Sequence, residues 1–457
     1  MCRMPKNLWK ILDYEKYEDY ITFSSIDSIF EQEIDERIVY IEDLKKRKQA
    51  YGICGECNEP GTGEYWCQSC NAKRFKDNLK NWTSGNEIID EFMQQSQLNA
   101  VHHTKYFEWI PFENFRNVTH TSSDGYGNFY SAEWPNGCIN SWNIENQKYE
   151  RSTNCKVALK SLYSDIRADF FNKIKSHLQI HSFDIIQCFG LTQDPGTRDY
   201  MMVLEYRDGK SLRNYLDSSD YNISYELKIF ILFQITKCLL DIHNAGKFHK
   251  NFHSEYILIN KDGYVSISGL GMCQPVNDEQ SFKEHKIISY LAPEVLHGHE
   301  YSKAADIYSF GIIMNELFSE EIPYNDISHD NYLTIKICKG NRPIISEDTP
   351  KLFANLIIRC WDAEVKNRPT TKELYDILKK LNYEKYFYES EICSQIEECD
   401  KIKEKFKNKF NKYRLSYISH LRARYSDIFL SPESKSDVDL SELEINEICQ
   451  DYADFIE

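Results

Sequence analysis

The stretch SYLAPEVLHGHEYSKAADIYSFG, residues 289–311, decides the fold of this chain of 457 residues. Short segments typical of strands come before it, namely FEWIPF from Phe107, GNFYSAEW from Gly127 and CKVALKSLY from Cys155. Longer patterns with helical spacing follow the strands and continue past residue 311. A small β-rich part before a larger helical part predicts an α+β fold with two lobes over residues 107–382.

Five short motifs of this region occur in one fixed order. They are VALK at 157–160, LEY at 204–206, APE at 292–294, DIYSFG at 306–311 and CWDAEVKNRPT at 360–370. Together they resemble the motifs of the protein kinase superfamily, most closely those of its tyrosine-kinase-like group. One such motif alone is weak evidence, but five in the family's order and spacing are hard to obtain by chance. The resemblance also implies that Arg368 pairs with Glu294 and supports the large lobe.

The resemblance implies a nucleotide slot between the two lobes. Its implied lining comprises Lys160, Ala158, Phe129, Leu204, Glu205, Tyr206 and Leu258. In the family, a glycine-rich loop closes on the phosphates through its backbone amides. Here the loop reads TSSDGYGNFY at 121–130, with Ser122 and Asp124 at the first two glycine positions and Phe129 at the valine position. Asp124 would repel phosphate, and Phe129 would fill the space above the adenine.

The residues that carry phosphoryl transfer in the family are replaced here. The transfer needs bound metal ions and a carboxylate that orients the attacking hydroxyl. The catalytic loop HKNFHSEY at 249–256 has Asn251 at the position of the base and Tyr256 at the position of a metal-binding asparagine. The triplet GLG begins with Gly269, where the family has a metal-binding aspartate. We therefore expect no catalytic residue, no magnesium site, and ATP binding that is weak or absent.

The helix after Lys160 also departs from the family pattern. The matching stretch FFNKIKSH at 170–177 offers Lys173 where the family has a glutamate that pairs with the lysine. Two lysines repel each other, so the ion pair of the active state is not expected. The kept residues are structural, since His249, Leu270 and Asp306 match the lower part of the family's hydrophobic column. A protein that works by binding would keep the residues that support the fold and lose those that carry out catalysis.

Four cysteines are clustered near the N-terminus, as the pairs Cys54/Cys57 and Cys67/Cys70. Two CxxC pairs separated by nine residues can place four thiolates around one ion, and zinc suits such soft ligands. Four free thiols or a redox pair are the alternatives. We expect structural zinc in a small zinc-ribbon-like module, because four protein ligands leave no position for a catalytic water.

The composition narrows the classes of function. The net charge of −16 argues against nucleic-acid binding by the whole chain, because phosphate contacts need an excess of Lys and Arg. The most apolar long stretch, from Tyr225, contains lysines and is expected to be a buried helix, not a membrane span. No secretory signal is expected, so the 15 cysteines favour a reducing compartment, the cytoplasm or alternatively the nucleus.

The predicted organisation has five parts, and flanking helices accompany the two folded modules. They are a helical segment over 1–50, the zinc-ribbon-like module over 51–75, a helical linker over 76–106, the kinase-like domain over 107–382 and a charged helical or disordered tail over 383–457. The first segment has Ile34, Ile38, Ile41 and Leu44 on one predicted helical face, and Ser84 with Glu87 predicts a capped helix start in the linker.

The tail has an unusual order of charges. Residues 401–425 hold nine basic residues and one glutamate, whereas residues 426–457 hold ten acidic residues and one lysine. Blocks of this kind are usually solvated or disordered, and opposite blocks can also pair with each other.

These observations favour a pseudokinase that acts as an intracellular signalling scaffold or regulator. Its expected partners are other proteins, active kinases among them, and neither a membrane nor a nucleic acid. One alternative is an active but atypical ATP-dependent Ser/Thr or Tyr kinase. The other is a regulator that binds nucleic acid through the zinc module, although residues 51–70 contain no Lys or Arg.

Overall fold

The computed structural model describes residues 7–13, 16–17, 39–124, 127–162, 171, 174–175, 177–178, 180, 184–218, 223–270, 274–275, 287–327 and 331–410. All of them belong to one unit that ends at Phe410. Within these ranges no helix combines the length and the apolar character needed to cross a membrane. Lys173 and the acidic block after residue 425 lie outside the described residues.

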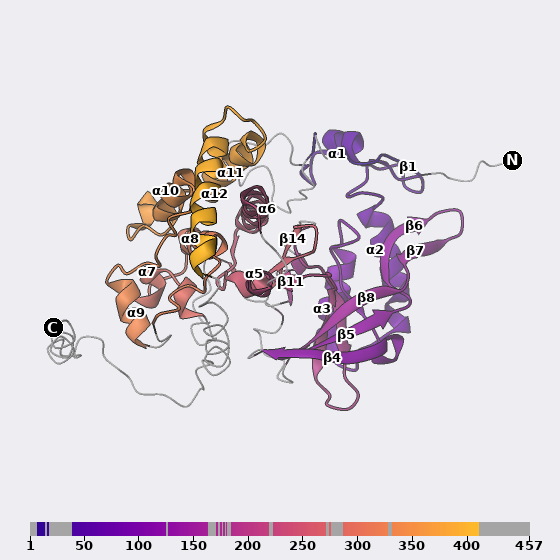
Figure 1. Ribbon diagram of the computed structural model, residues 1–457. Coiled ribbons are helices and arrows are strands. Elements are labelled where there is room, and N and C mark those ends of the chain that lie inside the picture. The colour runs from indigo at the N-terminus through magenta and orange to yellow at the C-terminus, as the bar shows by residue number, and fades with distance from the viewer. Residues whose placement is uncertain are drawn as a thin grey trace, which may run out of the picture. The chain divides into compact units, whose positions relative to one another are not determined.

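A mixed sheet forms the β-rich lobe (Figure 1). In the described part of the chain it has six strands in the order β3-β9-β10-β8-β5-β4. Their bounds are β3 (Glu108–Trp109), β4 (Arg116–Asp124), β5 (Gly127–Trp134), β8 (Cys155–Leu162), β9 (Cys188–Gln193) and β10 (Tyr200–Glu205). Neighbouring strands are antiparallel except β3 and β9, which pair in parallel. The strands predicted within 107–112, 127–134 and 155–163 are confirmed.

Both faces of this sheet are covered by apolar side chains. Successive residues of a strand point to opposite faces, and β10 follows this rule. Met202 lies in one cluster with Ile89 and Met93 of α3 (Glu87–Leu98), whereas Met201 and Val203 lie in a second cluster. The helix in the segment predicted as a linker is therefore part of the lobe's own core.

The helix α3 begins two residues later than predicted. Its N-cap is Asn86, whose side-chain oxygen accepts hydrogen bonds from the N–H groups of Ile88 and Ile89. The hydroxyl of Ser84 instead donates to the carboxylate of Asp90. The predicted cap was wrong because Asn86 is an equally good capping residue and lies closer to the apolar face.

The N-terminal helix is shorter than the apolar spacing predicted. Helix α1 spans Leu44–Ala50, and the side chain of Asp43 caps it by accepting from the N–H of Lys46. Ile41 therefore lies before the helix, while Ile34 and Ile38 lie outside the described residues. Asp43 provides a local start signal that interrupts the longer pattern.

The second lobe is mainly helical. Its helices are α5 (Leu212–Asp217), α6 (Tyr225–Asn244), α7 (Pro293–Leu296), α8 (Lys303–Ser319), α9 (Asn331–Cys338), α10 (Lys351–Cys360), α11 (Thr371–Glu384) and α12 (Glu391–Phe410). Helices α6 and α8 run through its core, as the apolar stretch from Tyr225 predicted. Ile392 and Ile396 of α12 belong to the same core, so the first part of the predicted tail packs on this lobe (Figure 1).

Short strands complete the described part of the chain. They are β1 (Leu8–Trp9), β2 (Gly52–Ile53), β6 (Cys138–Asn143), β7 (Lys148–Ser152), β11 (Lys210–Ser211), β12 (Lys247–Phe248), β13 (Ile257–Ile259), β14 (Val265–Ile267) and β15 (Gln274–Pro275). The hairpin β6–β7 is inserted between β5 and β8 and lies beside helix α2 (Gln68–Asn78) (Figure 1). Strands β13 and β14 form a hairpin whose ends carry Tyr256 and Gly269.

Candidate functional site

The loop at 249–256 is held by the carboxylate of Asp306 on α8. Its two oxygens accept hydrogen bonds from the backbone N–H groups of His249, at 2.8 Å, and Lys250, at 3.1 Å. His243 Nε2 and the Tyr301 hydroxyl each lie 2.8 Å from the same carboxylate. Burial alone would raise the pKa of Asp306, but its hydrogen bond with His243 and its contacts with His249 hold that pKa below the ordinary value. A buried negative charge thus fixes the loop.

Asn251 is buried inside this loop, between the fixed backbone of Lys250 and the buried ring of Phe252. An amide side chain neither carries a charge nor accepts a proton near neutral pH. The loop therefore keeps its backbone geometry around a residue that cannot act as a general base.

Tyr256 and Gly269 lie directly against each other. A Cβ atom added to Gly269 would be 2.8 Å from Cγ of Tyr256 and 2.9 and 3.0 Å from the two δ carbons of its ring. Gly269 also has a φ of +82°, a backbone conformation that favours glycine. Ser268 fixes the arrangement, because its backbone N–H donates to the carbonyl of Tyr256 at 2.9 Å. No side chain at position 269 has room while this ring stays in place.

Three adjacent strands carry the upper part of the implied nucleotide slot. Ala158 of β8 pairs with Leu204 of β10, and Lys160 of β8 pairs with Phe129 of β5. The ammonium of Lys160 lies 4.9 Å from the centroid of the Phe129 ring, a distance at which a cation and an aromatic ring attract each other. Leu258 lies on β13, in the helical lobe.

The end of β10 carries the other implied slot residues. Glu205 forms an ion pair with Arg207 at 2.9 Å, and burial raises the pKa of its carboxyl. The ring of Tyr206 lies 3.8 Å from the ammonium of Lys156. The side chains of Ser122, Asp124 and Lys173 lie outside the described residues.

Arg368 and Glu294 form the pair that the motifs implied. The guanidinium donates two parallel hydrogen bonds to the carboxylate, at 2.7 and 2.8 Å, and the Arg368 side chain is fully buried. Its Nε–H and a second N–H of Nη1 donate to the carbonyls of Asp362 and Ala304, at 2.9 Å each. This pair therefore connects the start of α7 to the loop before α11.

Comparison with known protein families identifies the family to which this fold belongs. The family described as protein tyrosine and serine/threonine kinase matches residues 119–378, more than half of the chain. The chain belongs to this kinase family. The matched region begins within β4, so it contains most of the β-rich lobe and most of the helical lobe, whereas α3 and β3 precede it.

Several curated kinases are similar to the kinase region. A probable LIM domain-containing serine/threonine-protein kinase of Dictyostelium discoideum is 30% identical over 173 residues, 38% of this chain and 26% of that protein. Serine/threonine-protein kinase pakC of the same organism is 30% identical over 183 residues, 39% and 38% of the two chains. A putative serine/threonine-protein kinase/receptor of Acanthamoeba polyphaga mimivirus is 29% identical over 175 residues, 38% and 11%. The match thus spans less than half the length of each relative.

The metal positions of the kinase family do not fit magnesium in this chain. Protein kinases hold the ions with the aspartate of DFG and the asparagine of the catalytic loop. Gly269 has no side-chain oxygen, and the Tyr256 ring covers the space beside it. These two positions therefore offer neither the carboxylate nor the amide oxygen that the family uses.

A buried polar network behind the loop was not predicted from the sequence. The Tyr290 hydroxyl donates to Glu316 at 2.6 Å and lies 3.0 Å from the Ser254 hydroxyl, and Arg213 pairs with Glu316 at 2.9 Å. The sequence signal that could have revealed the network is Glu316, which lies inside the apolar run of α8, since a buried carboxylate needs hydrogen-bond partners. The network ties the kinase loop to α8 and α5 by polar contacts.

His253 adds an aromatic contact to the same loop. Its ring centroid lies 4.5 Å from that of Tyr256 and 5.8 Å from that of Tyr290. Burial first, and then the neighbouring His249, lower the pKa of His253 to about 3. The imidazole is therefore neutral at physiological pH.

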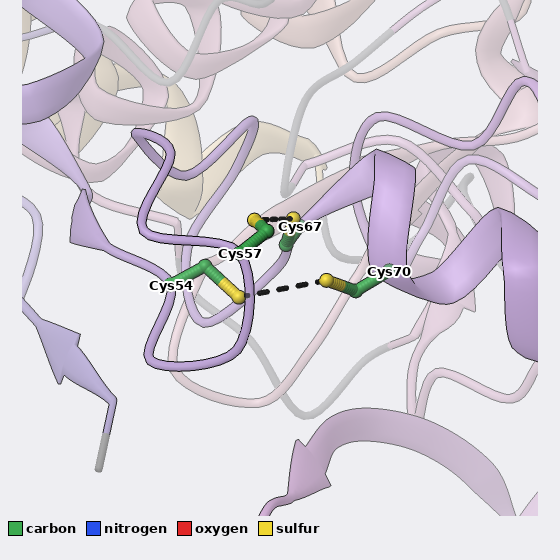
Figure 2. Close-up of side chains that lie close together, drawn as sticks. All are labelled: Cys54, Cys57, Cys67 and Cys70. Carbon is green, nitrogen blue, oxygen red and sulfur yellow. Dashed lines mark hydrogen bonds between the residues drawn. The ribbon is translucent and has the colours of Figure 1, made fainter. Parts of the chain in front are cut away.

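The four clustered cysteines come together at the start of α2 (Figure 2). Their sulfur atoms all lie within 4.8 Å of one another, and the described residues contain no other such group of potential metal ligands. Cys57 and Cys67 are 3.5 Å apart, and Cys54 and Cys70 are 3.8 Å apart. Sulfurs at about 2.3 Å from a central zinc ion would be about 3.8 Å apart in a tetrahedron. The four residues therefore fit a structural zinc ion.

The crowding of these thiols separates their pKa values. A hydrogen bond from Cys67 lowers the pKa of Cys54 to about 5, although burial opposes the shift. Burial and the charge of Cys54 raise the pKa of Cys70 to about 12. A bound cation favours the thiolate form of all its ligands, so it would relieve this competition.

Arg47 supports the cysteine loop and was missed in the sequence. Its guanidinium donates to the carbonyls of Gly61, Pro60 and Ile41 at 2.9, 2.7 and 2.8 Å. Burial lowers the pKa of Arg47. The carbonyls satisfy the buried guanidinium and hold the turn between the two cysteine pairs.

The cysteine module packs on the kinase lobe through aromatic rings. Trp66 is fully buried, donates its indole N–H to the carbonyl of Ala100 at 2.8 Å and stacks on Tyr106 at 5.9 Å. Phe75 of α2 stacks on Tyr149 of the β6–β7 hairpin at 5.8 Å. The module and the β-rich lobe therefore share one small core.

Proposed function

We propose that this member of the kinase family is a pseudokinase of the tyrosine-kinase-like group. It acts in the cytoplasm as a signalling scaffold or regulator and binds other proteins, active kinases among them. The observation that carries the proposal is the contact of Tyr256 with Gly269. Neither residue offers a metal ligand, and the Tyr256 ring occupies the space that an aspartate side chain at position 269 would need.

Two further features support loss of phosphotransfer. Asn251 lacks the carboxylate that orients the attacking hydroxyl. Lys160, which in the family binds ATP phosphates, lies beside the ring of Phe129. ATP binding is therefore weak or absent, and magnesium does not strengthen it.

The interactions that stabilise the large lobe are retained, and this favours a binding role. Asp306 still fixes the loop, and Arg368 still pairs with Glu294 inside the large lobe. A rigid lobe presents a stable surface to partners although its chemistry is lost. Structural zinc held by Cys54, Cys57, Cys67 and Cys70 would add a second rigid module to that surface.

A second candidate function is phosphotransfer by an atypical serine/threonine kinase. The names of the relatives from Dictyostelium discoideum favour it, since they are serine/threonine-protein kinases. Such an enzyme requires magnesium-dependent ATP binding and transfer to protein.

Calorimetry with ATP, with and without magnesium, separates the two functions. The matched variant is Lys160→Met, which removes the ammonium beside Phe129. We expect the wild-type chain and the variant to bind ATP equally poorly in both conditions and to transfer no radiolabelled phosphate to a generic protein substrate. Tight magnesium-dependent binding, with label transfer that Lys160→Met abolishes, would establish the enzyme and end the pseudokinase proposal.

A further inference from the structure

A groove of about 330 Å³ lies where three separate segments meet, and it shares no residue with the nucleotide slot. The segments are β1, the turn between the two cysteine pairs, and the β6–β7 hairpin. Each contributes one large aromatic residue, namely Trp9, Tyr65 and Trp142. Three aromatic residues that line one groove offer ring surfaces to which a cation can be attracted.

The three rings are positioned by their own segments. Trp9 packs against the turn, since a Cβ atom added to Gly61 would lie 3.0 Å from its Cζ3. Tyr65 sits in a turn with a φ of +51° and remains 37% exposed. Trp142 already binds one cation, because the guanidinium of Arg74 lies 4.0 Å from its ring, and Arg74 itself pairs with Glu56. Arg74 does not line the groove.

The residues that line the groove include two acidic side chains and no basic one. Glu145 and Glu150 of the hairpin line the groove, and both are exposed. The stretch 51–70, from which Tyr65 lines the groove, contains Glu59, Glu64 and Glu56, of which Glu56 pairs with Arg74, and no Lys or Arg. The field therefore favours a positively charged ligand over a neutral one.

The amide groups of the groove are already hydrogen bonded within the protein. The Asn143 carbonyl oxygen accepts from the N–H groups of Glu145 and Asn146 at 3.0 and 2.9 Å, and its amide donates to Glu150 at 2.8 Å. The Asn7 side-chain oxygen accepts from the N–H of Gly55 at 2.9 Å. An ammonium group would have to place its three N–H donors on Glu145 and Glu150, whereas a trimethylammonium group has no N–H donor and needs only the rings and the negative charge.

We propose that this groove binds a trimethylammonium group carried by the trimethyl-lysine side chain of a partner protein. The three rings contact the methyl groups and the positive charge, and Glu145 and Glu150 attract the charge from the rim. The site is independent of the nucleotide slot, so it stands whether or not the chain transfers phosphate.

Titration calorimetry of the full chain with short peptides tests the proposal. The peptides carry, at one central position, trimethyl-lysine, unmodified lysine, or the neutral isostere in which carbon replaces the ammonium nitrogen. We expect the trimethyl-lysine peptide to bind at least about tenfold more tightly than the other two. Tetramethylammonium chloride should compete with it, whereas sodium chloride at equal ionic strength should compete less.

Two variants and one control locate the site. Tyr65→Ala removes one ring and should weaken binding about tenfold, and Glu145→Gln should weaken it about threefold. Tyr388→Ala is the matched control, because Tyr388 is 90% exposed and does not line the groove. Equal binding of the trimethyl-lysine and isostere peptides, tighter binding of unmodified lysine, or unchanged affinity in both groove variants would each overturn the proposal. The Glu145→Gln result keeps the test decisive if Tyr65→Ala unfolds.

Discussion

The ring of Tyr256 occupies the space in which a side chain at position 269 would begin, with Cγ only 2.8 Å from the place of a Cβ atom. Gly269→Ala should therefore lower the free energy of unfolding by about 2–4 kcal/mol, through overlap and through the strained φ. In a Tyr256→Asn background the cost should fall to about 1 kcal/mol, since only the backbone term remains. Urea denaturation of the wild type, the two single variants and the double variant forms a double-mutant cycle, which measures the coupling energy between positions 256 and 269.

The control for this cycle is Gly298→Ala. Gly298 has a φ of +83°, and an added Cβ atom there meets nothing within 4 Å, so it isolates the backbone cost. Equal losses of stability for Gly269→Ala and Gly298→Ala, with no coupling to Tyr256, would mean that the ring does not fill this space.

Replacing Phe129 by valine should open the slot without repairing the metal site. The variant removes the ring 4.9 Å from the Lys160 ammonium and leaves Gly269 and Tyr256 unchanged. We expect ATP affinity to rise several-fold because the ring no longer fills the space above the adenine, and to rise equally with and without magnesium because Gly269 and Tyr256 supply no metal ligand. Phe129→Tyr keeps the ring and serves as the control. An affinity gain in Phe129→Val that needs magnesium would contradict the loss of the metal site.

Loss of Arg368 should destabilise the large lobe strongly. Arg368→Ala leaves the Glu294 carboxylate without its two hydrogen bonds, at a cost of about 3–5 kcal/mol of unfolding free energy. Lys372→Ala is the control, because the pair of Lys372 with Asp376 is more than half exposed and should contribute less than about 1 kcal/mol. Chemical denaturation compares the two variants. Similar midpoints for both would show that burial adds nothing to the Arg368–Glu294 pair.

The cysteine module should contain one zinc ion per chain. The double variant Cys57→Ser with Cys67→Ser should lose the ion, because these residues supply half of the four thiols. The control is Cys338→Ser with Cys393→Ser, two partly buried thiols outside the group. Elemental analysis measures the zinc. Equal zinc contents in the two double variants would rule out binding by the cluster.

Hydrogen exchange then shows how far the effect of zinc extends. Because Trp66 and Phe75 share a core with Tyr106 and Tyr149, exchange should increase in both α2 and the β6–β7 hairpin of the zinc-free variant. An increase confined to residues 51–70 would mean that the module and the lobe are not energetically coupled.

The sequence predicted those features whose residues lie in short, ordered motifs. The Arg368–Glu294 pair was implied by the resemblance of two short motifs to those of the kinase family, whereas the clustering of the four cysteines followed from their spacing. The strands at 127 and 155 followed from short segments whose composition is typical of strands. The replaced positions Asn251, Tyr256 and Gly269 could be named for the same reason, but not their contact.

The remaining features depend on tertiary packing. The overlap of Tyr256 with position 269 appears only after the β13–β14 hairpin brings the two residues together. Helix α3 could not be assigned to the sheet's core because an amphipathic pattern does not identify the surface on which a helix packs. Arg47 carried no local signal, since its partners are backbone carbonyls up to 14 residues away. The start of α3 was misplaced because Ser84 and Asn86 are both good caps.

The buried His253 should make the stability of the chain depend on pH. Its pKa is lowered to about 3 in the folded state, mainly by burial, against about 6.5 for an unfolded histidine. Below pH 6.5 the unfolded chain takes up a proton that the folded chain does not, so stability is highest above this pH and falls as the pH decreases toward 3. The loss is about 1.4 kcal/mol per pH unit, or about 2 kcal/mol between pH 6.5 and 5.

The variant His253→Asn tests this dependence. It removes the titrating ring and keeps an acceptor for the N–H of Glu255, which now donates to Nδ1 of His253 at 3.3 Å. Urea denaturation between pH 7.5 and 5 should show that the free energy of unfolding falls less steeply with pH in the variant than in the wild type. The difference in unfolding free energy between the two proteins above pH 7 reports only the changed packing. His177, whose pKa burial lowers to about 4, contributes with the same sign, so the wild-type decline should exceed that of one histidine. Parallel pH profiles for the wild type and His253→Asn would show that His253 accepts a proton in the folded kinase lobe and is not held neutral by its neighbours.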